Sequence, residues 1–120
     1  MILFVDDEKI ILDTLQRQLA ALGKHFQLEF AESAEEALEI LEEEEDLKLI
    51  VSDWLMPGMK GDELLNEVSL LFPEAARVLL TAHAPSNVIK DMNEEKLATV
   101  MIKPWDQNEL KDTVHQLLYN

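Results

Sequence analysis

The sequence predicts an α/β protein in which helices cover both faces of a doubly wound, five-stranded parallel sheet. Three observations lead to this fold class. Five short apolar runs alternate with longer segments of helical periodicity, the second run is built differently from the first, third and fourth, and capping signals divide the segments at consistent places. No linker, repeat or low-complexity segment interrupts the pattern, so we expect a single domain over residues 1–120.

The expected strands are the five apolar runs, Ile2–Val5, Phe26–Ala31, Leu49–Ser52, Val78–Thr81 and Val100–Ile102. Continuously apolar runs such as the first, third and fourth are typical of parallel strands that are buried on both faces. The second run alternates apolar and polar residues, which indicates a strand at the edge of the sheet. An edge position for the second strand suits the order 2-1-3-4-5, the flavodoxin-like (βα)5 arrangement.

The segments between the runs have the spacing of amphipathic helices. Apolar residues recur three and four positions apart in five groups: Ile11/Leu15/Leu19/Leu22, Ala34/Ala37/Leu38/Leu41, Leu64/Val68/Leu71/Phe72, Val88/Ile89/Met92 and Leu110/Val114/Leu117/Leu118. Capping-box spacing marks two helix starts, Ser33 with Glu36 and Asp106 with Glu109. We expect the first helix to end at Gly23 and the third at Pro73.

Composition excludes several classes of function. The absence of cysteine rules out a disulfide framework and thiolate metal sites and fits the reducing cytoplasm. No apolar segment is long enough to span a bilayer and no signal-peptide pattern follows Met1, so we expect no membrane partner. A formal charge of −15 would repel a phosphate backbone, so direct nucleic-acid binding is not expected.

Polar side chains stand at the ends of four of the five expected strands. Asp6 and Asp7 follow the first strand, Asp53 ends the third, Thr81 ends the fourth and Lys103 follows the fifth. In an open parallel sheet the carboxyl ends of the strands meet at one rim, and binding sites form there near the point where the strand order reverses. We therefore expect these side chains to converge.

The residue types at this rim suit phosphoryl transfer. Two carboxylates about 4 Å apart repel by about 4 kcal/mol at an effective dielectric near 20, and a cation relieves that cost. Oxygen ligands without imidazole or thiolate favour Mg²⁺. An ammonium such as that of Lys103 and a hydroxyl such as that of Thr81 can contact phosphoryl oxygens, while a carboxylate acts as nucleophile.

Each of these residues also has an ordinary structural explanation. The Asp pair can form a turn or a helix cap, Asp53 can begin a loop, Thr81 can end a strand, and Lys103 can be a surface residue before a proline turn. The coincidence of four complementary residue types at four ends of one sheet favours the functional interpretation.

Four segments resemble the marker segments of response-regulator receiver domains from two-component signalling. They are Ile2–Glu8 (ILFVDDE), Ile50–Gly61 (IVSDWLMPGMKG), Leu79–Ala82 (LLTA) and Ile102–Trp105 (IKPW), in order over essentially the whole chain. The resemblance implies that Asp53 accepts the phosphoryl group, with Thr81 and Lys103 contacting it. It also implies a metal site made of the acidic pair Asp6 and Asp7 with Asp53 and the Leu55 backbone carbonyl, in which Asp7, Asp53 and that carbonyl hold Mg²⁺ directly. The Lys103–Pro104 peptide is expected to be cis.

The same resemblance implies a signalling switch instead of a metabolic enzyme. A sensor histidine kinase or a histidine phosphotransfer protein would supply the phosphoryl group, and the face formed by the fourth helix, fifth strand and fifth helix would rearrange. The resemblance leaves open whether a C-terminal effector domain is attached and whether the chain forms a homodimer. One departure concerns this output: many family members have Tyr or Phe three residues before the lysine, where this chain has Val100.

Three rival functions compete with this interpretation. A nucleotide or flavin binder would need Gly, Ser or Thr in the first loop, where Asp6-Asp7-Glu8 would repel phosphate. A Mg²⁺-dependent phosphohydrolase of small phosphate esters shares the nucleophilic Asp and the metal. It usually has a second acid two residues after the nucleophile, where this chain has Leu55, and a cap over the site. A receiver-like module that signals without phosphorylation would not need the complete set of acids, Thr81 and Lys103.

Overall fold

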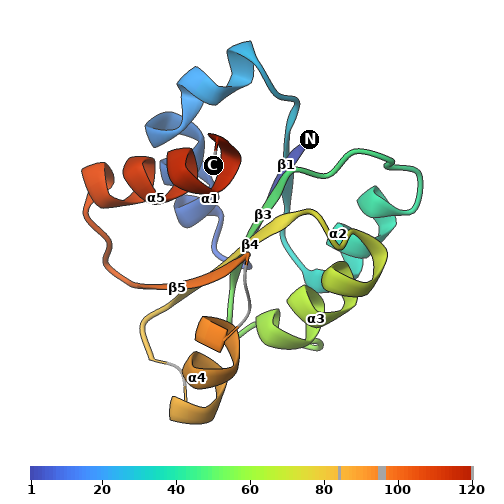
Figure 1. The fold of residues 1–120 in the computed structure, drawn as a ribbon, viewed down its shortest axis with the longest axis vertical. Helices are drawn as coiled ribbons and strands as arrows, with labels where there is room; N and C mark the ends of the chain where they lie inside the picture. Colours follow the sequence, from blue (N-terminus) through green and yellow to red (C-terminus); the bar gives the residue numbers. More distant parts are fainter. Residues whose placement is uncertain (84, 95–96, 120) are drawn as a thin grey trace.

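The computed structural model describes residues 1–83, 85–94 and 97–119 and contains one sheet of five parallel strands (Figure 1). The strands are β1 (Ile2–Val5), β2 (Leu28–Ala31), β3 (Leu49–Asp53), β4 (Ala76–Thr81) and β5 (Ala98–Ile102). Their order is β2-β1-β3-β4-β5, so the predicted fold class and strand order are confirmed. The second strand begins two residues later than expected, and the fourth and fifth begin two residues earlier.

Helices follow the strands in regular alternation. They are α1 (Lys9–Gln18), the 3₁₀ helix η1 (Ala20–Lys24), α2 (Ala34–Leu41), α3 (Gly61–Leu71), α4 (Ser86–Glu94) and α5 (Gln107–Tyr119). The Ser33 Oγ accepts from the Glu36 N–H at 3.0 Å and the Asp106 Oδ1 from the Glu109 N–H at 3.1 Å, which confirms both predicted N-caps. Within the described residues, no helix combines the length and apolarity needed to cross a membrane.

The first helix ends earlier than its apolar spacing predicts. We expected it to continue to Gly23, but α1 stops at Gln18 and the chain tightens into η1. The Leu22 N–H donates to the Leu19 carbonyl at 3.0 Å, a bond to the third preceding residue instead of the fourth. Leu22 is partly buried and still packs against the core from this turn, so the apolar spacing identified a core contact although the hydrogen bonding differs from that of an α-helix.

Two apolar layers cover the two faces of the sheet. Figure 1 shows α1 and α5 on one side and α2 and α3 on the other. Alternate strand residues supply both layers: Leu3 and Ile50 pack with α2, α3 and α4, whereas Phe4 and Val51 pack with α1 and α5. Because both faces are covered, strands β1, β3 and β4 are buried along their whole length. Their parallel pairing brings their carboxyl ends to one rim.

Candidate functional site

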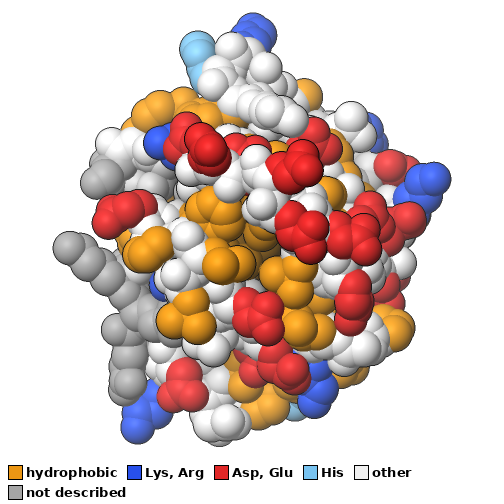
Figure 2. Space-filling model, turned by 90° about the vertical axis from the view of Figure 1, so that its right-hand side faces the viewer, with side chains coloured by type: hydrophobic (Ala, Val, Ile, Leu, Met, Phe, Trp, Pro, Cys, Tyr) orange, Lys and Arg blue, Asp and Glu red, His pale blue; other side chains and the backbone are white. Residues whose placement is uncertain are grey.

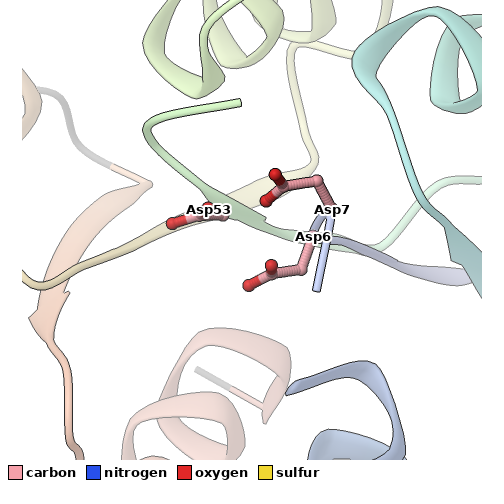
Figure 3. A group of neighbouring side chains, drawn as sticks. All are labelled: Asp6, Asp7 and Asp53. Atoms are coloured by element: carbon pink, nitrogen blue, oxygen red, sulfur yellow. The ribbon is translucent and has the colours of Figure 1, made fainter. Parts of the chain in front are cut away.

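Three aspartates from two neighbouring strand ends converge at this rim. Asp6 and Asp7 follow β1, and Asp53 is the last residue of β3, which pairs with β1 (Figure 3). One carboxylate oxygen from each lies within 4.8 Å of the others. Asp6 is fully buried, Asp53 is 8% exposed, and Asp7 faces solvent. The sequence-based prediction that these acids meet is therefore confirmed.

Lys103 completes the cluster from the edge strand. Its Nζ donates to Asp6 Oδ2 at 2.9 Å and to Asp53 Oδ1 at 3.0 Å, and its side chain is only 14% exposed. The Lys103 N–H donates to the Thr81 carbonyl at 2.8 Å, which attaches the end of β5 to β4. The Lys103–Pro104 peptide is cis, as the family resemblance implied.

Both oxygens of Asp6 have partners within the chain. Oδ2 accepts from Lys103, and Oδ1 accepts from the Glu8 N–H at 2.8 Å. The Asp6 N–H donates to the Ala31 carbonyl of β2 at 3.1 Å, which fixes the start of the loop. Asp6 therefore orients the lysine, and the carboxylates of Asp7 and Asp53 are better placed to receive a ligand from solvent.

The charges at the site do not balance. Three carboxylates and one ammonium leave a formal charge of −2. Burial raises the pKa of Asp53, and repulsion from Asp6 adds to the rise, although the Lys103 hydrogen bond opposes it. Burial alone would lower the pKa of Lys103, but hydrogen bonds to Asp6 and Asp53 outweigh it and raise that pKa. An all-oxygen donor set with two uncompensated charges fits a hard divalent cation such as Mg²⁺.

Thr81 and Leu55 lie close to this cluster in the fold. Thr81 ends β4, the strand between β3 and β5, and it is buried, with 3% of its surface exposed. Its Oγ1 accepts from the His83 N–H at 3.1 Å, which leaves the hydroxyl proton free to donate elsewhere. Leu55 is two residues beyond Asp53 with its side chain 62% exposed, so a role for it rests on the backbone.

Sequence reasoning gave no role to Lys60, Gly61 or Asp62, which fasten the loop after Asp53. The Gly61 N–H donates to the Trp54 carbonyl at 2.7 Å, and the Trp54 indole donates to Asp62 Oδ1 at 3.1 Å. The Lys60 ammonium lies 5.6 Å from the centre of the Trp54 ring, a cation–π distance. The first turn of α3 thus holds the residue next to Asp53. The glycines of the Ile50–Gly61 segment were the available signal.

Replacing Gly61 with alanine is expected to lower the free energy of unfolding by about 1–3 kcal/mol, the usual cost of overpacking. A Cβ at this position would lie 2.0 Å from the Asp53 carbonyl oxygen and 2.9 Å from the Trp54 Cα, both backbone atoms. Urea denaturation measures the change. Gly23→Ala is the matched control, because its Cβ would meet only Leu28 Cδ1 at an ordinary 3.7 Å. Equal stabilities for the two variants would contradict the close approach.

Comparison with known proteins identifies the family. The family model described as the response regulator receiver domain matches residues 2–115 of this sequence. The chain belongs to this family. Receiver domains are signalling switches of two-component systems, so the predicted family and function class are confirmed, and the rival phosphohydrolase is not favoured.

Individual relatives agree with the family match. The receiver domain is 34% identical over 96% of its length to the hydrogenase transcriptional regulatory protein HoxA of Cupriavidus necator, of which it spans 23%. It is 27% identical over 98% of its length to a chemotaxis protein CheY homolog of Campylobacter jejuni and covers 91% of that protein. The signal receiver domain of an HD domain-containing protein from Pseudomonas fluorescens superposes with a TM-score of 0.85 at 36% identity, over 98% of this chain and 85% of that one.

Proposed function

We propose that Asp53 is the phosphoacceptor of this receiver domain and that Thr81 and Lys103 assist the transfer. The observation that carries the proposal is the position of the Lys103 ammonium, 3.0 Å from Asp53 Oδ1 and 2.9 Å from Asp6 Oδ2. A positive charge held beside one carboxylate of a crowded group is suited to neutralise phosphoryl oxygens as they approach.

The residues present suit a bound Mg²⁺ ion. Asp7, Asp53 and the backbone carbonyl of Leu55 would hold it, because both oxygens of Asp6 already accept hydrogen bonds. The ion would supply positive charge against the phosphoryl oxygens and the crowded carboxylates. Asp6 acts on Lys103, whose direction it sets through the 2.9 Å contact.

The transfer itself exchanges one bond to phosphorus for another. An oxygen of Asp53 attacks the phosphorus of a partner's phosphohistidine, the new P–O bond forms as the P–N bond breaks, and the bonding pair leaves with the imidazole, which takes a proton from solvent. Lys103 neutralises a phosphoryl oxygen. The Thr81 hydroxyl accepts from the His83 N–H, so its own proton can donate to another phosphoryl oxygen.

The proposal extends to partners and setting. A sensor histidine kinase or a histidine phosphotransfer protein donates the phosphoryl group in the cytoplasm, and residues 1–120 act as one receiver domain within a longer protein. The chain spans only 23% of HoxA, which supports the last point.

The output face responds through the end of β5. Val100 occupies the position of the usual aromatic ring, and it pairs with Leu79 of β4 and packs against the core.

Incubation with labelled acetyl phosphate and Mg²⁺ tests this function directly. A switch incorporates at most one phosphoryl group per chain, as an acyl phosphate that hydroxylamine cleaves. A phosphohydrolase instead turns over p-nitrophenyl phosphate many times without a lasting adduct. Continuous turnover of the ester at a rate above that of label uptake would reject the switch in favour of the hydrolase.

Mg²⁺ is expected to stabilise the wild-type domain by about 2.7 kcal/mol at a hundredfold excess over its dissociation constant. The Asp7→Asn variant should lose most of this gain yet match the wild type in chelator, because Asp7 is exposed. Thermal melts with Mg²⁺ and with EDTA measure both effects. Asp13→Asn removes an exposed acid from α1 and serves as the control. Equal Mg²⁺ responses in all three proteins would place the ion elsewhere.

A further inference from the structure

An apolar hollow lies between α2 and α3, away from the aspartate cluster. Leu38 and Leu41 of α2 and Leu71 and Phe72 at the end of α3 form its floor, and its volume is about 590 Å³. Leu71 is 61% exposed, and the adjacent Leu70 is 76% exposed. Figure 2 views the side of the molecule that carries α2 and α3, and it shows apolar side chains in a central hollow.

The rim of this hollow is uniformly acidic. Glu42, Glu44, Glu45 and Glu67 border it, and its lining contains no Lys, Arg or His among the described residues. Asp46 and Glu74 extend the rim along an adjoining hollow that shares Leu71 and Phe72. Lys48, which also lines that hollow, is paired with Asp46 at 3.0 Å. Acidic side chains surround the apolar centre in Figure 2.

The spacing of these residues forms two facing stripes. On one side Leu38 and Leu41 are i and i+3 at the end of α2, and Glu42, Glu44 and Glu45 lie in the turn that follows the helix. On the other side Glu67 and Leu71 are i and i+4 on α3. Each stripe combines leucine with glutamate. An apolar seam between two acidic borders is complementary to a helix whose apolar edge is flanked by Lys or Arg.

We propose that this groove binds a cationic amphipathic helix of a partner protein. The apolar floor supplies buried area, and the glutamate borders select positive flanks. A second copy of this chain fits poorly, because pairing two such grooves would bring like-charged borders together and the chain carries a formal charge of −15. The groove contains none of the residues assigned to phosphoryl transfer, so it adds a second function to the domain and is tested independently of Asp53.

Fluorescence anisotropy with the intact 120-residue chain tests the proposal. The probe is a labelled peptide of about 15 residues made of Leu, Lys and Ala, with Leu at helical spacing and Lys on both flanks. A peptide of the same composition in scrambled order measures the general attraction of an acidic protein for a cation. We expect the patterned peptide to bind at least tenfold more tightly and to shift the methyl resonances of Leu38 and Leu71.

Two matched pairs of variants locate the contact. Leu71→Asn is expected to weaken binding about tenfold, whereas Ile10→Asn, which changes an apolar residue on α1 that is 70% exposed, leaves it unchanged. Glu45→Gln with Glu67→Gln should weaken binding about threefold at low salt, and Asp13→Asn with Asp112→Asn should not. Equal effects in a variant and its control, equal binding of the scrambled peptide, or unmoved Leu38 and Leu71 resonances would overturn the proposal.

Discussion

Asp53→Asn is expected to reduce phosphoryl incorporation from acetyl phosphate to the background level. The amide oxygen is a far weaker nucleophile than a carboxylate, and it cannot form the acyl phosphate that defines the switch. Quantitative labelling with Mg²⁺ present, followed by hydroxylamine treatment, measures the loss. No other substitution in this domain should have so large an effect, because this one replaces the carboxylate that we propose attacks phosphorus.

The loss would not result from unfolding. The Asn amide oxygen can still accept from Lys103, which contacts the wild-type carboxylate at 3.0 Å. Burial raises the pKa of Asp53 above its ordinary value, so a neutral side chain suits this position in the absence of metal. Melting curves in EDTA should therefore show an Asp53→Asn protein at least as stable as the wild type. Label uptake at the wild-type rate, or a label mapped to Asp7, would refute the assignment.

Lys103→Met is expected to slow phosphorylation about 100- to 1,000-fold, the usual cost of removing one preorganised electrostatic group. Methionine fills similar space but leaves Asp6 and Asp53 without the ammonium that lies within 3.0 Å of each. The initial rate of labelling at saturating acetyl phosphate measures the effect. Mg²⁺ binding should persist, because the formal charge of the site, −2 for the three acids together with Lys103, becomes −3 when the lysine is lost.

Two further lysine variants separate chemistry from general charge effects. Lys60→Met removes a nearby cation that lies over Trp54 instead of the carboxylates, and it should label at a rate close to that of the wild type. Lys103→Arg keeps the charge, but the planar guanidinium cannot take the place of a compact ammonium between two acceptors, so we expect partial recovery. A Lys103→Met protein that labels as fast as Lys60→Met would exclude Lys103 from the transfer.

The convergence of the site was predictable because parallel strands bring their carboxyl ends to one rim. Asp6, Asp53 and Lys103 are far apart in sequence, yet the alternation of apolar runs and helical segments sufficed to place them together. The apolar period could not predict where α1 gives way to a 3₁₀ helix, because a residue three positions after Leu19 packs against the core in either helix type.

The contacts that support the loop after Asp53 depend on how the chain runs in three dimensions, which no local sequence pattern predicts. The approach of Gly61 to the Asp53 carbonyl follows from how α3 returns over the end of β3, and the Trp54–Asp62 bond follows from the same path. The raised pKa of Asp53 likewise depends on its burial and on its distance from Asp6. Sequence reasoning predicted which side chains meet at the rim, whereas their environment required coordinates.

Lys103 joins three strands at once, through its backbone to β4 and through its side chain to the ends of β1 and β3. Any change in the charge carried by Asp53 therefore acts directly on the backbone of the outermost strand. Such mechanical coupling needs no rotating ring, so a receiver with valine in place of the customary aromatic retains a route by which its chemistry can reach a distant surface.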